Sequence, residues 1–327
     1  MNGGERTAVL AGLGTCLPRQ EVDNAALLAR LDTSDSWIRE RTGIAARRIA
    51  GADVSVGDLG HAAGENALKA AGLATVDAVV VATSTPDRPL PAVAPRIATT
   101  LGLGAVPAFD VSAACSGFLY ALAVSAGLVA TGVAGDVLLV ATEKYSDIVD
   151  PADRATAVLF GDGAGAAVLR SGRRGDPGAL LGVDWGSDGT GRELISVPER
   201  YDGFLAMAGK RVYLKAVEHM AGSTLRVLDR CGWAIGDVDA LVPHQANKRI
   251  IQAVAQRLSL PERKAVCALE RTGNTAAASI PLALAHGQEA GTLGAGDRVV
   301  LTAFGAGLAW ASAGLVWPDI TTVRSEL

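Results

Sequence analysis

Three residues that lie far apart in the chain could carry chemistry: Cys115, His244 and Asn274. Cys115 lies among tiny residues in AACSGF, where an apolar strand over residues 107–111 is followed by a long apolar helix. A free thiol is a poor nucleophile at neutral pH, and the positive end of a helix favours its thiolate. We therefore expect Cys115 to be a nucleophile. The alternative is a small buried hydrophobic residue, which is the commoner role of a free cysteine.

His244 and Asn274 each have a functional and a structural interpretation. His244 follows the apolar run ALVP, and functional sites of α/β proteins gather at the ends of strands. The alternative is a histidine that caps a loop. Asn274 follows Gly273 and precedes a helix, which suits either a helix N-cap or a catalytic amide.

An internal repeat relates the two halves of the chain. The VDA triplets of AAGLATVDAVVVATST and DRCGWAIGDVDALVPHQ begin 162 residues apart (238 − 76 = 162), and two AGD triplets begin 161 apart (295 − 134 = 161). An offset of 161 places Ala276 opposite Cys115, so AACSGF and GNTAAAS should open equivalent helices close to Asn274. A third echo, between FGDGAGAAVL and FGAGLAWASAGLV, has a shorter spacing of 144 (304 − 160 = 144). It predicts extra loop in the first half, at residues 147–158.

The elements that position these residues alternate between strands and helices. Uninterrupted apolar runs at residues 79–83, 137–142, 241–243 and 298–303 are typical of strands covered on both faces. The pattern predicts an α/β fold of two pseudo-duplicated halves, 1–172 and 173–327, with one site between them. Residues 111–135 carry no charge and are long enough to cross a bilayer. Their Ala, Ser, Thr and Gly content, and the strand-like GDVLLVAT that follows, predict a helix buried in a soluble protein instead.

Composition argues against several classes of protein. The 327 residues have a net charge of −4 and a pI of about 5.6, without a basic stripe, so we expect no nucleic-acid partner. The four cysteines form no CxxC pair, which argues against structural zinc. The N-terminal MNGGERTAVLAG lacks the apolar core of a signal peptide, so we expect a cytoplasmic protein with free thiols.

Six segments, in one order, resemble those of β-ketoacyl-acyl-carrier-protein synthase III, a decarboxylating condensing enzyme of the thiolase fold. They are SDSWIRERTGI, ACSGF, VDPADRATAVLFGDGAGAAVL, PHQAN, GNTAAASIP and AFGAGLAW. The similarity extends over essentially the whole length, and the combination of this cysteine with HQAN and GNT is highly specific. The resemblance implies a thiolase-like αβαβα layering of the two halves and a homodimer.

The resemblance also implies a two-stage reaction. Cys115 would take the acyl group from an acyl-CoA, with the backbone amides of Cys115 and Ala306 forming the oxyanion hole. Malonyl-acyl-carrier protein would then lose carbon dioxide, and His244 and Asn274, two donors without a carboxylate, would stabilise the enolate that attacks the acyl-cysteine. The β-ketoacyl-carrier protein would initiate fatty acid or polyketide synthesis. Coenzyme A is a substrate here, and no metal or other cofactor is implied.

A same-fold acyltransferase is the alternative. It would move the acyl group from coenzyme A or a carrier protein to the hydroxyl or amine of a small molecule. Such relatives usually alter the histidine or the asparagine, and this chain keeps both His244 and Asn274.

Binding residues for coenzyme A are likewise implied by the resemblance. Trp37 and Arg154 would clamp the adenine, and Arg41 would meet phosphates. Asn247 and Gly209 would lie along the pantetheine tunnel. The structural alternatives are a half-buried helix residue for Trp37 and a solvated loop residue for Arg154.

The acyl chain and the carrier protein complete the implied contacts. Leu90 of one subunit would close the acyl pocket of its partner. The other pocket walls would be Tyr145, Phe160 and Leu205. An acidic carrier protein would dock on the basic residues Lys248 and Arg249, whose alternative role is that of a solvated helix face.

Overall fold

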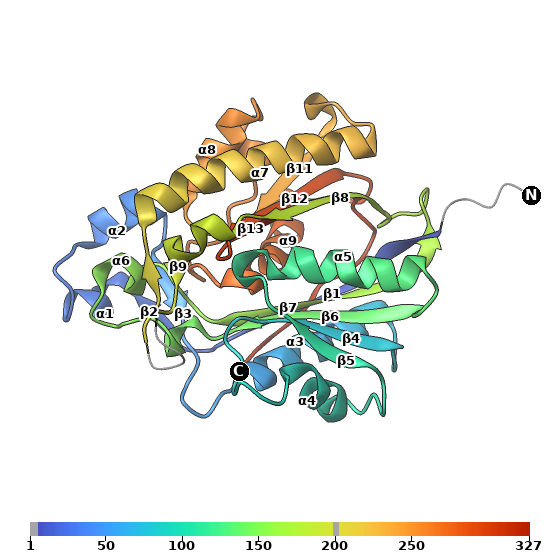
Figure 1. Cartoon of the computed structure of the whole chain (residues 1–327), viewed down its shortest axis with the longest axis horizontal. Helices are drawn as coiled ribbons and strands as arrows, with labels where there is room; N and C mark the ends of the chain where they lie inside the picture. Colours follow the sequence, from blue (N-terminus) through green and yellow to red (C-terminus); the bar gives the residue numbers. More distant parts are fainter. Residues whose placement is uncertain (1–5, 199–202) are drawn as a thin grey trace, which may run out of the picture.

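The computed structural model describes residues 6–198 and 203–327. Two β-sheets are separated by a layer of helices and covered by helices on their outer faces (Figure 1). The first sheet has the order β14-β1-β7-β6-β4-β5, and the second has the order β11-β12-β13-β8. The first comprises β1 (Arg6–Leu17), β4 (Ala78–Ala82), β5 (Ala108–Val111), β6 (Asp136–Glu143), β7 (Gly163–Arg173) and β14 (Val323–Glu326). The second comprises β8 (Leu180–Ser187), β11 (Ala240–Pro243), β12 (Arg298–Gly305) and β13 (Ala309–Val316).

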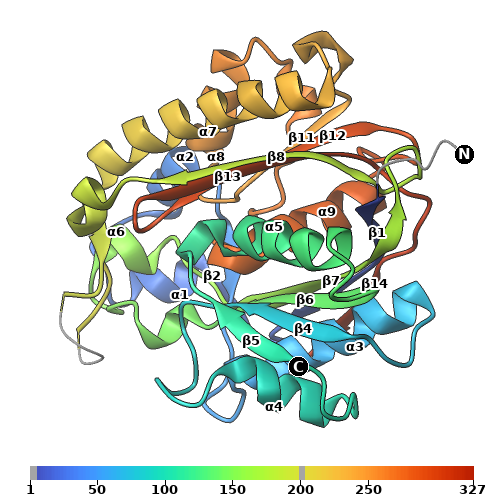
Figure 2. The ribbon, with the colours of Figure 1, turned by 45° about the vertical axis from the view of Figure 1, so that its right-hand side comes forward.

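Helices α5 (Gly117–Ala130) and α9 (Ser279–Glu289) form the central layer, as the turned view in Figure 2 shows. Helices α3 (Val56–Ala71) and α4 (Val93–Thr100) cover the outer face of the first sheet. Helices α7 (Gly209–Cys231) and α8 (Lys248–Arg257) lie on the outer side of the second. The predicted αβαβα layering is therefore confirmed. The division at residue 172 remains a prediction, and β14, from the end of the chain, pairs with β1 in the first sheet.

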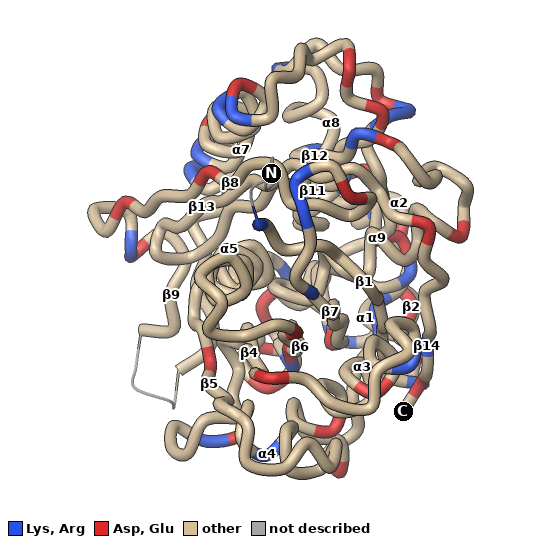
Figure 3. Tube along the Cα trace, turned by 90° about the vertical axis from the view of Figure 1, so that its right-hand side faces the viewer, with Lys and Arg blue, Asp and Glu red and all other residues tan. Residues whose placement is uncertain are grey.

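The charge-free segment forms the buried helix α5. Its Phe118, Leu119 and Leu122 are buried in a core cluster that includes strand residues of both sheets. Figure 3 shows the charged residues on the outer elements and loops, whereas the coil of α5 carries none. A helix packed between two sheets must be apolar towards both of them, and the residues of α5 that reach solvent, such as Gly127 and Ala130, are small and uncharged. Among the described residues, no helix is long and apolar enough to span a membrane.

The internal repeat is present in three dimensions, at an offset of 162. Strand β6 begins at Asp136 and its counterpart β12 at Arg298 (298 − 136 = 162). The same offset relates two single-turn 3₁₀ helices, η1 (Ala114–Ser116) and η6 (Ala276–Ala278). Ala114 and Ala276 even share a left-handed backbone, with φ of 45° and 46°. The counterpart of Cys115 is therefore Ala277. The prediction of Ala276 is wrong by one residue. It used the offset of 161 between the two AGD triplets, which lie at the entrances to β6 and β12, whereas the strands themselves begin 162 residues apart.

A set of short elements, which we call the cap, lies over one end of both halves (Figure 1). It comprises β2 (Glu21–Asp23), α1 (Asn24–Leu28), α2 (Asp35–Thr42), β3 (Ala46–Arg48), η2 (Tyr145–Asp147), α6 (Arg154–Ala157), β9 (Ile195–Ser196) and β10 (Ala206–Met207). Residues 144–162 connect β6 to β7, whereas residues 306–308 suffice between β12 and β13. The extra loop predicted for the first half is confirmed.

Arg47 holds the cap together from inside. Its side chain is buried, and the guanidinium donates hydrogen bonds to the Val22 carbonyl (3.0 Å), Asn24 Oδ1 (2.8 Å) and the Val158 carbonyl (3.1 Å). Burial lowers the pKa of Arg47 to about 10, which leaves the group charged at neutral pH. One buried cation thus joins three segments of the cap.

Candidate active site

A cavity of about 280 Å³ brings together the three residues that the sequence singled out. Cys115, His244 and Asn274 all line it, although they come from different connections of the two halves. Most of the remaining lining is apolar, including Met207, Val212, Met220 and Phe304. The cavity therefore combines a thiol, an imidazole and a carboxamide in surroundings that exclude much of the water.

Cys115 is held at the centre of the molecule by close backbone packing. It lies on η1, between the end of β5 and the start of α5. A Cβ atom added to Gly305, the last residue of β12, would lie 2.8 Å from the Cys115 backbone nitrogen. Only glycine permits this approach. The end of β12 thus brings the following residue, Ala306, to the wall of the same cavity.

The electrostatics of Cys115 differ from the sequence-based expectation. The residue is 9% exposed, and burial, helped by the charge of Glu143, raises the pKa of its thiol to about 12. Burial and Glu143 thus oppose the resting thiolate that the helix end was expected to favour. The thiol is protonated at neutral pH, so its proton must leave as it attacks.

Glu143 is a buried residue near Cys115 that the sequence reasoning missed. Its carboxylate, at the end of β6, accepts hydrogen bonds from the Ser84 hydroxyl (2.9 Å) and the Thr85 hydroxyl (2.6 Å). Burial raises the pKa of Glu143 to about 7 despite these donors. The signal was present in the sequence: VLLVATE places a single acid at the end of an otherwise apolar and buried strand.

His244 directly follows β11 and is 2% exposed. Burial lowers its pKa to about 3, so the imidazole is neutral at physiological pH. Its Nδ1 lies 2.6 Å from the Ser279 hydroxyl at the start of α9. Nε2 makes no hydrogen bond to any of the described residues, and His244 lines the cavity. A neutral imidazole in this setting can offer one hydrogen-bonding nitrogen to a bound molecule.

The side chain of Asn274 bonds to the backbone and also lines the cavity. Its Oδ1 accepts a hydrogen bond from the Ala276 amide (2.9 Å), two residues on, in an Asx turn that precedes η6. Its backbone pairs with the first half, donating to the Leu159 carbonyl (2.8 Å) and accepting from the Gly161 amide (3.0 Å). With Oδ1 occupied, the NH₂ group is the part of the Asn274 side chain left to donate to a molecule in the cavity. The N-cap interpretation is wrong by one residue, because Thr275 is the N-cap of η6, whereas the catalytic interpretation remains a prediction.

Six further predicted residues line the cavity: Trp37, Tyr145, Phe160, Gly209, Asn247 and Ala306. The rings of Tyr145 and Phe160 stack at 4.8 Å between centroids, forming one wall. Tyr213 and the methionines were not singled out from the sequence. The signal for Tyr213 was the apolar stripe of α7, where residues 209, 212, 213, 216 and 220 follow helical spacing and all line the cavity.

The other predicted residues lie outside this lining. Leu205 packs in the same core cluster as Cys115 without lining the cavity, and Leu90 is 83% exposed. Lys248 and Arg249 are exposed in the first turn of α8, next to the cavity residue Asn247. The remaining two, Arg41 and Arg154, are exposed beside Trp37.

Arg154 contacts Trp37 directly. The centre of its guanidinium lies 4.9 Å from the centroid of the indole ring, and that of Arg41 lies 5.8 Å away. Arg154 also donates a hydrogen bond to the Asp32 carbonyl (2.8 Å). The spacing between Arg154 and Trp37 is too small to admit an aromatic ring, so an adenine clamp requires Arg154 to move.

The described residues contain no group of three or more His, Cys, Asp or Glu side chains placed to hold a metal ion. All four cysteines are free thiols.

Comparisons with known proteins agree on one family. Residues 109–189 match the family model 3-oxoacyl-[acyl-carrier-protein] synthase III, and residues 228–317 match the model for its C-terminal part. β-Ketoacyl-[acyl-carrier-protein] synthase III 3 of Streptomyces coelicolor is 52% identical, over 97% of this chain and 99% of the relative.

Solved structures give the same result. The 3-oxoacyl-(acyl carrier protein) synthase III of Pseudomonas aeruginosa PAO1 superimposes with a TM-score of 0.94 at 52% identity, covering 96% of this chain and 99% of that one. The priming β-ketosynthase of the R1128 polyketide pathway has a TM-score of 0.91 at 39% identity, covering 98% and 99%. The predicted thiolase-like fold is confirmed by these neighbours. This chain belongs to the β-ketoacyl-[acyl-carrier-protein] synthase III family of acyl-transferring condensing enzymes.

Proposed function

We propose that this chain condenses an acyl-CoA starter with malonyl-acyl-carrier protein, releasing carbon dioxide. The product, a β-ketoacyl-carrier protein, initiates fatty acid or polyketide synthesis. One observation carries the proposal: a single buried cavity holds the thiol of Cys115, the imidazole of His244 and the carboxamide of Asn274. The relatives that this chain resembles are named as synthases of this kind.

The first stage is acyl transfer to Cys115. Its sulfur attacks the thioester carbonyl, and the backbone amides of Cys115 and Ala306 receive the oxyanion. The bond to coenzyme A then breaks. The thiol proton ends on the sulfur of coenzyme A, so this stage consumes no net proton. Because burial raises the pKa of Cys115 to about 12, its proton leaves during attack rather than beforehand.

The second stage forms the carbon–carbon bond. The carbon–carbon bond to the malonyl carboxylate breaks and carbon dioxide leaves, so the electron pair forms an enolate of the thioester. His244 and Asn274 donate hydrogen bonds to the enolate oxygen, where the charge develops. The enolate carbon attacks the acyl-cysteine carbonyl and expels the Cys115 sulfur, which regains a proton from solvent. The neutral state of His244, whose pKa burial lowers to about 3, suits a donor that keeps its proton.

Coenzyme A would lie along the cavity towards Trp37. Asn247 and Gly209 line this cavity and would meet the pantetheine arm. Arg154 would leave its cation–π contact with the indole ring of Trp37 and form a similar contact with the adenine ring. Arg41, exposed on the same side of Trp37, would receive phosphates.

An acidic carrier protein would dock at the start of α8. Lys248 and Arg249 are exposed there. The Arg249 guanidinium lies 5.9 Å from the ring of Tyr213, and Tyr213 lines the cavity. A carrier protein held at these two cations would have its prosthetic arm next to the cavity. Charge complementarity of this type mainly accelerates encounter.

A homodimer would complete the acyl pocket. Leu90 is 83% exposed, and Phe109 is partly exposed on β5, an edge strand of the first sheet. Large apolar side chains beside an open strand edge favour association with a second chain. In such a dimer Leu90 would close the partner's pocket against Tyr145, Phe160 and Leu205. We further propose a cytoplasmic location, which the four free thiols support. The chemistry calls for no cofactor.

Labelled substrates test the proposal. The wild-type chain, given acyl-CoA labelled in the acyl group, should become labelled on Cys115. It should then release carbon dioxide from malonyl-acyl-carrier protein and transfer the label to a β-ketoacyl product. Cys115→Ser should lose stable labelling and condensation, whereas Cys267→Ser, the same change at an exposed thiol, should keep both.

Two results would overturn the proposal. Labelling of Cys115 followed by transfer to a hydroxyl or amine, without carbon dioxide release, would assign the same-fold acyltransferase. Full condensing turnover by Cys115→Ser would remove the nucleophile from the mechanism.

A further inference from the structure

The hydrogen-bonding partners of Ser279 constrain the imidazole of His244. Ser279 is the first residue of α9 and is buried. Its Oγ lies 2.6 Å from His244 Nδ1 and accepts a hydrogen bond from the Gln245 backbone amide at 3.3 Å. Among the described residues, these are the two hydrogen-bonding partners of Oγ.

The contacts of Oγ bear on the direction of the bond to His244. The Gln245 amide can only donate, so it occupies one lone pair of Oγ and leaves the second lone pair and the hydroxyl proton. Among the described residues, His244 Nδ1 is the one acceptor that contacts Oγ and could take this proton. Because burial keeps the imidazole neutral, its one N–H must be on the other nitrogen, Nε2.

We propose that Ser279 is a positioning residue that fixes His244 in the Nε2–H tautomer, so that His244 acts as a hydrogen-bond donor inside the substrate cavity. The opposite tautomer would direct a lone pair at the enolate oxygen and repel it. This proposal rests on the proposed function for the role of that donor. The tautomer itself rests on these contacts and on the neutral charge of the buried imidazole, and does not depend on the reaction.

Gln245 keeps Ser279 and His244 in place. Its side-chain amide donates to the Pro243 carbonyl (2.6 Å), and its Oε1 accepts from the Ala268 amide (2.7 Å). Both ends of the Gln245 side chain are thus tied to backbone, at the end of β11 and at the segment that follows η5 (Glu262–Lys264). The backbone N–H that donates to Ser279 therefore has little freedom to turn away.

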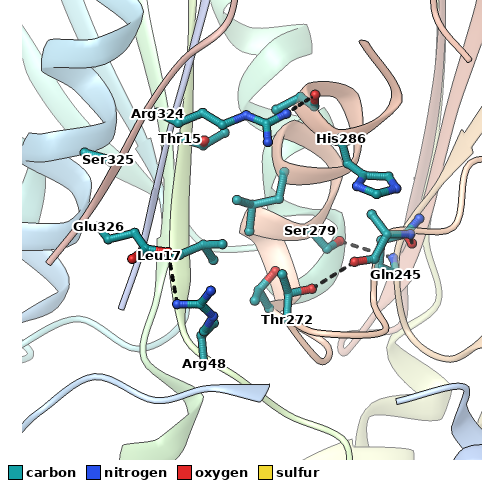
Figure 4. Close-up of a pocket in the computed structure, with 14 residues that line it drawn as sticks. Thr15, Leu17, Arg48, Gln245, Thr272, Ser279, His286, Arg324, Ser325 and Glu326 are labelled. Atoms are coloured by element: carbon teal, nitrogen blue, oxygen red, sulfur yellow. Dashed lines mark hydrogen bonds and ion pairs between the residues drawn. The ribbon is translucent and has the colours of Figure 1, made fainter. Parts of the chain in front are cut away.

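The hydrogen bond between Ser279 and His244 joins residues that line two different cavities. Ser279 and Gln245 line a second cavity of about 330 Å³, between α9 and the strands β1 and β14 (Figure 4). His244 lines only the substrate cavity. In Figure 4 a dashed line joins the Ser279 oxygen to Gln245, whose backbone amide donates this hydrogen bond. Ser279 thus acts on the reaction from behind the imidazole, without lining the cavity that holds the substrate.

The tautomer can be read directly by ¹⁵N NMR of histidine-labelled protein at neutral pH, with the His244 signals assigned by loss in His244→Gln. The wild-type chain should show an unprotonated Nδ1 and a protonated Nε2. In Ser279→Ala both ring nitrogens should shift towards the values of a tautomer mixture, and Ser279→Thr, which keeps the hydroxyl, should retain the wild-type pattern. A protonated Nδ1 in the wild-type chain overturns the proposal. This readout needs no substrate, so it stands even if the proposed condensation fails.

Kinetics separate positioning from general destabilisation. Ser279→Ala should acylate Cys115 at the wild-type rate but release carbon dioxide from malonyl-acyl-carrier protein about 10- to 100-fold more slowly, the usual cost of one orienting hydrogen bond. Ser125→Ala is the matched control, because Ser125 is buried on the other central helix, α5, and its Oγ has no partner in the described residues. Unchanged decarboxylation in Ser279→Ala, or an equal loss in Ser125→Ala, overturns the proposal. If Ser279→Ala does not fold, the wild-type spectrum alone decides.

Discussion

A pH titration of Cys115 tests the electrostatics of the site most directly. Burial and Glu143 raise the pKa of the thiol from an ordinary value of 9.0 to about 12. At pH 8 about one thiol in ten thousand is then ionised, roughly a thousandfold fewer than at a pKa of 9. Because iodoacetamide reacts with the thiolate, the alkylation rate should rise about tenfold per pH unit between pH 7 and 10, without a plateau.

Mass spectrometry of the peptides that contain Cys115 and Cys267 measures both rates in one sample. Cys267 is exposed and should react far faster at every pH. Glu143→Gln removes the second cause of the raised pKa and should accelerate alkylation of Cys115 at a given pH. Glu65→Gln, an exposed change of the same type on α3, should leave the rate unaltered.

A plateau of the Cys115 rate below pH 9 would refute this reasoning. It would mean that the N-terminal end of α5 stabilises the thiolate more than burial destabilises it. An unchanged rate in Glu143→Gln would remove that carboxylate from the explanation while leaving burial in place.

Three further predictions concern packing and stability. Gly305→Ala places a Cβ within 2.8 Å of the Cys115 backbone nitrogen and should slow acylation of Cys115 at least about tenfold by mass spectrometry; Gly189→Ala, made in open space, should not. Arg47→Ala leaves three oxygen acceptors of the cap without their donor and should lower the free energy of unfolding by about 3 kcal/mol in urea titrations, and an unchanged midpoint would contradict this. Below pH 6.5 the unfolded chain protonates His244, whereas the folded chain does so only near pH 3, so the free energy of unfolding should decrease as the pH is lowered from 6.5 to 3. In His244→Phe this decrease, measured by urea titrations at several pH values, should be shallower, and the same slope in both proteins would contradict the prediction.

Much of the fold could be predicted from local sequence. Apolar runs without alternation marked the strands, since β4, β6, β11 and β12 are covered on both faces and hold few polar residues. The repeat predicted two equivalent halves, because similar local patterns form similar elements. The charge-free stretch around α5 identified the central layer, because a helix packed between two sheets must be apolar towards both.

The resemblance led to Cys115, His244 and Asn274, but the side chains that govern them came only from the structure. Ser279 carries no signal in the sequence, and Glu143 carries only that of an acid that ends an apolar run; each acquires its role by contacting a segment distant along the chain. Their effects depend on which groups share a small dry volume, and no local pattern encodes that.

The sequence by itself determined which elements form and which reactive groups the chain carries, because backbone propensity and apolar spacing are local properties. The charge state of those groups was decided by tertiary structure alone. The helix end that follows Cys115 predicted a thiolate, yet packing by β12 and Glu143 leaves a thiol with a pKa of about 12. Hydration and Coulomb energies depend on everything within several ångströms, and most of those neighbours are far away in the chain.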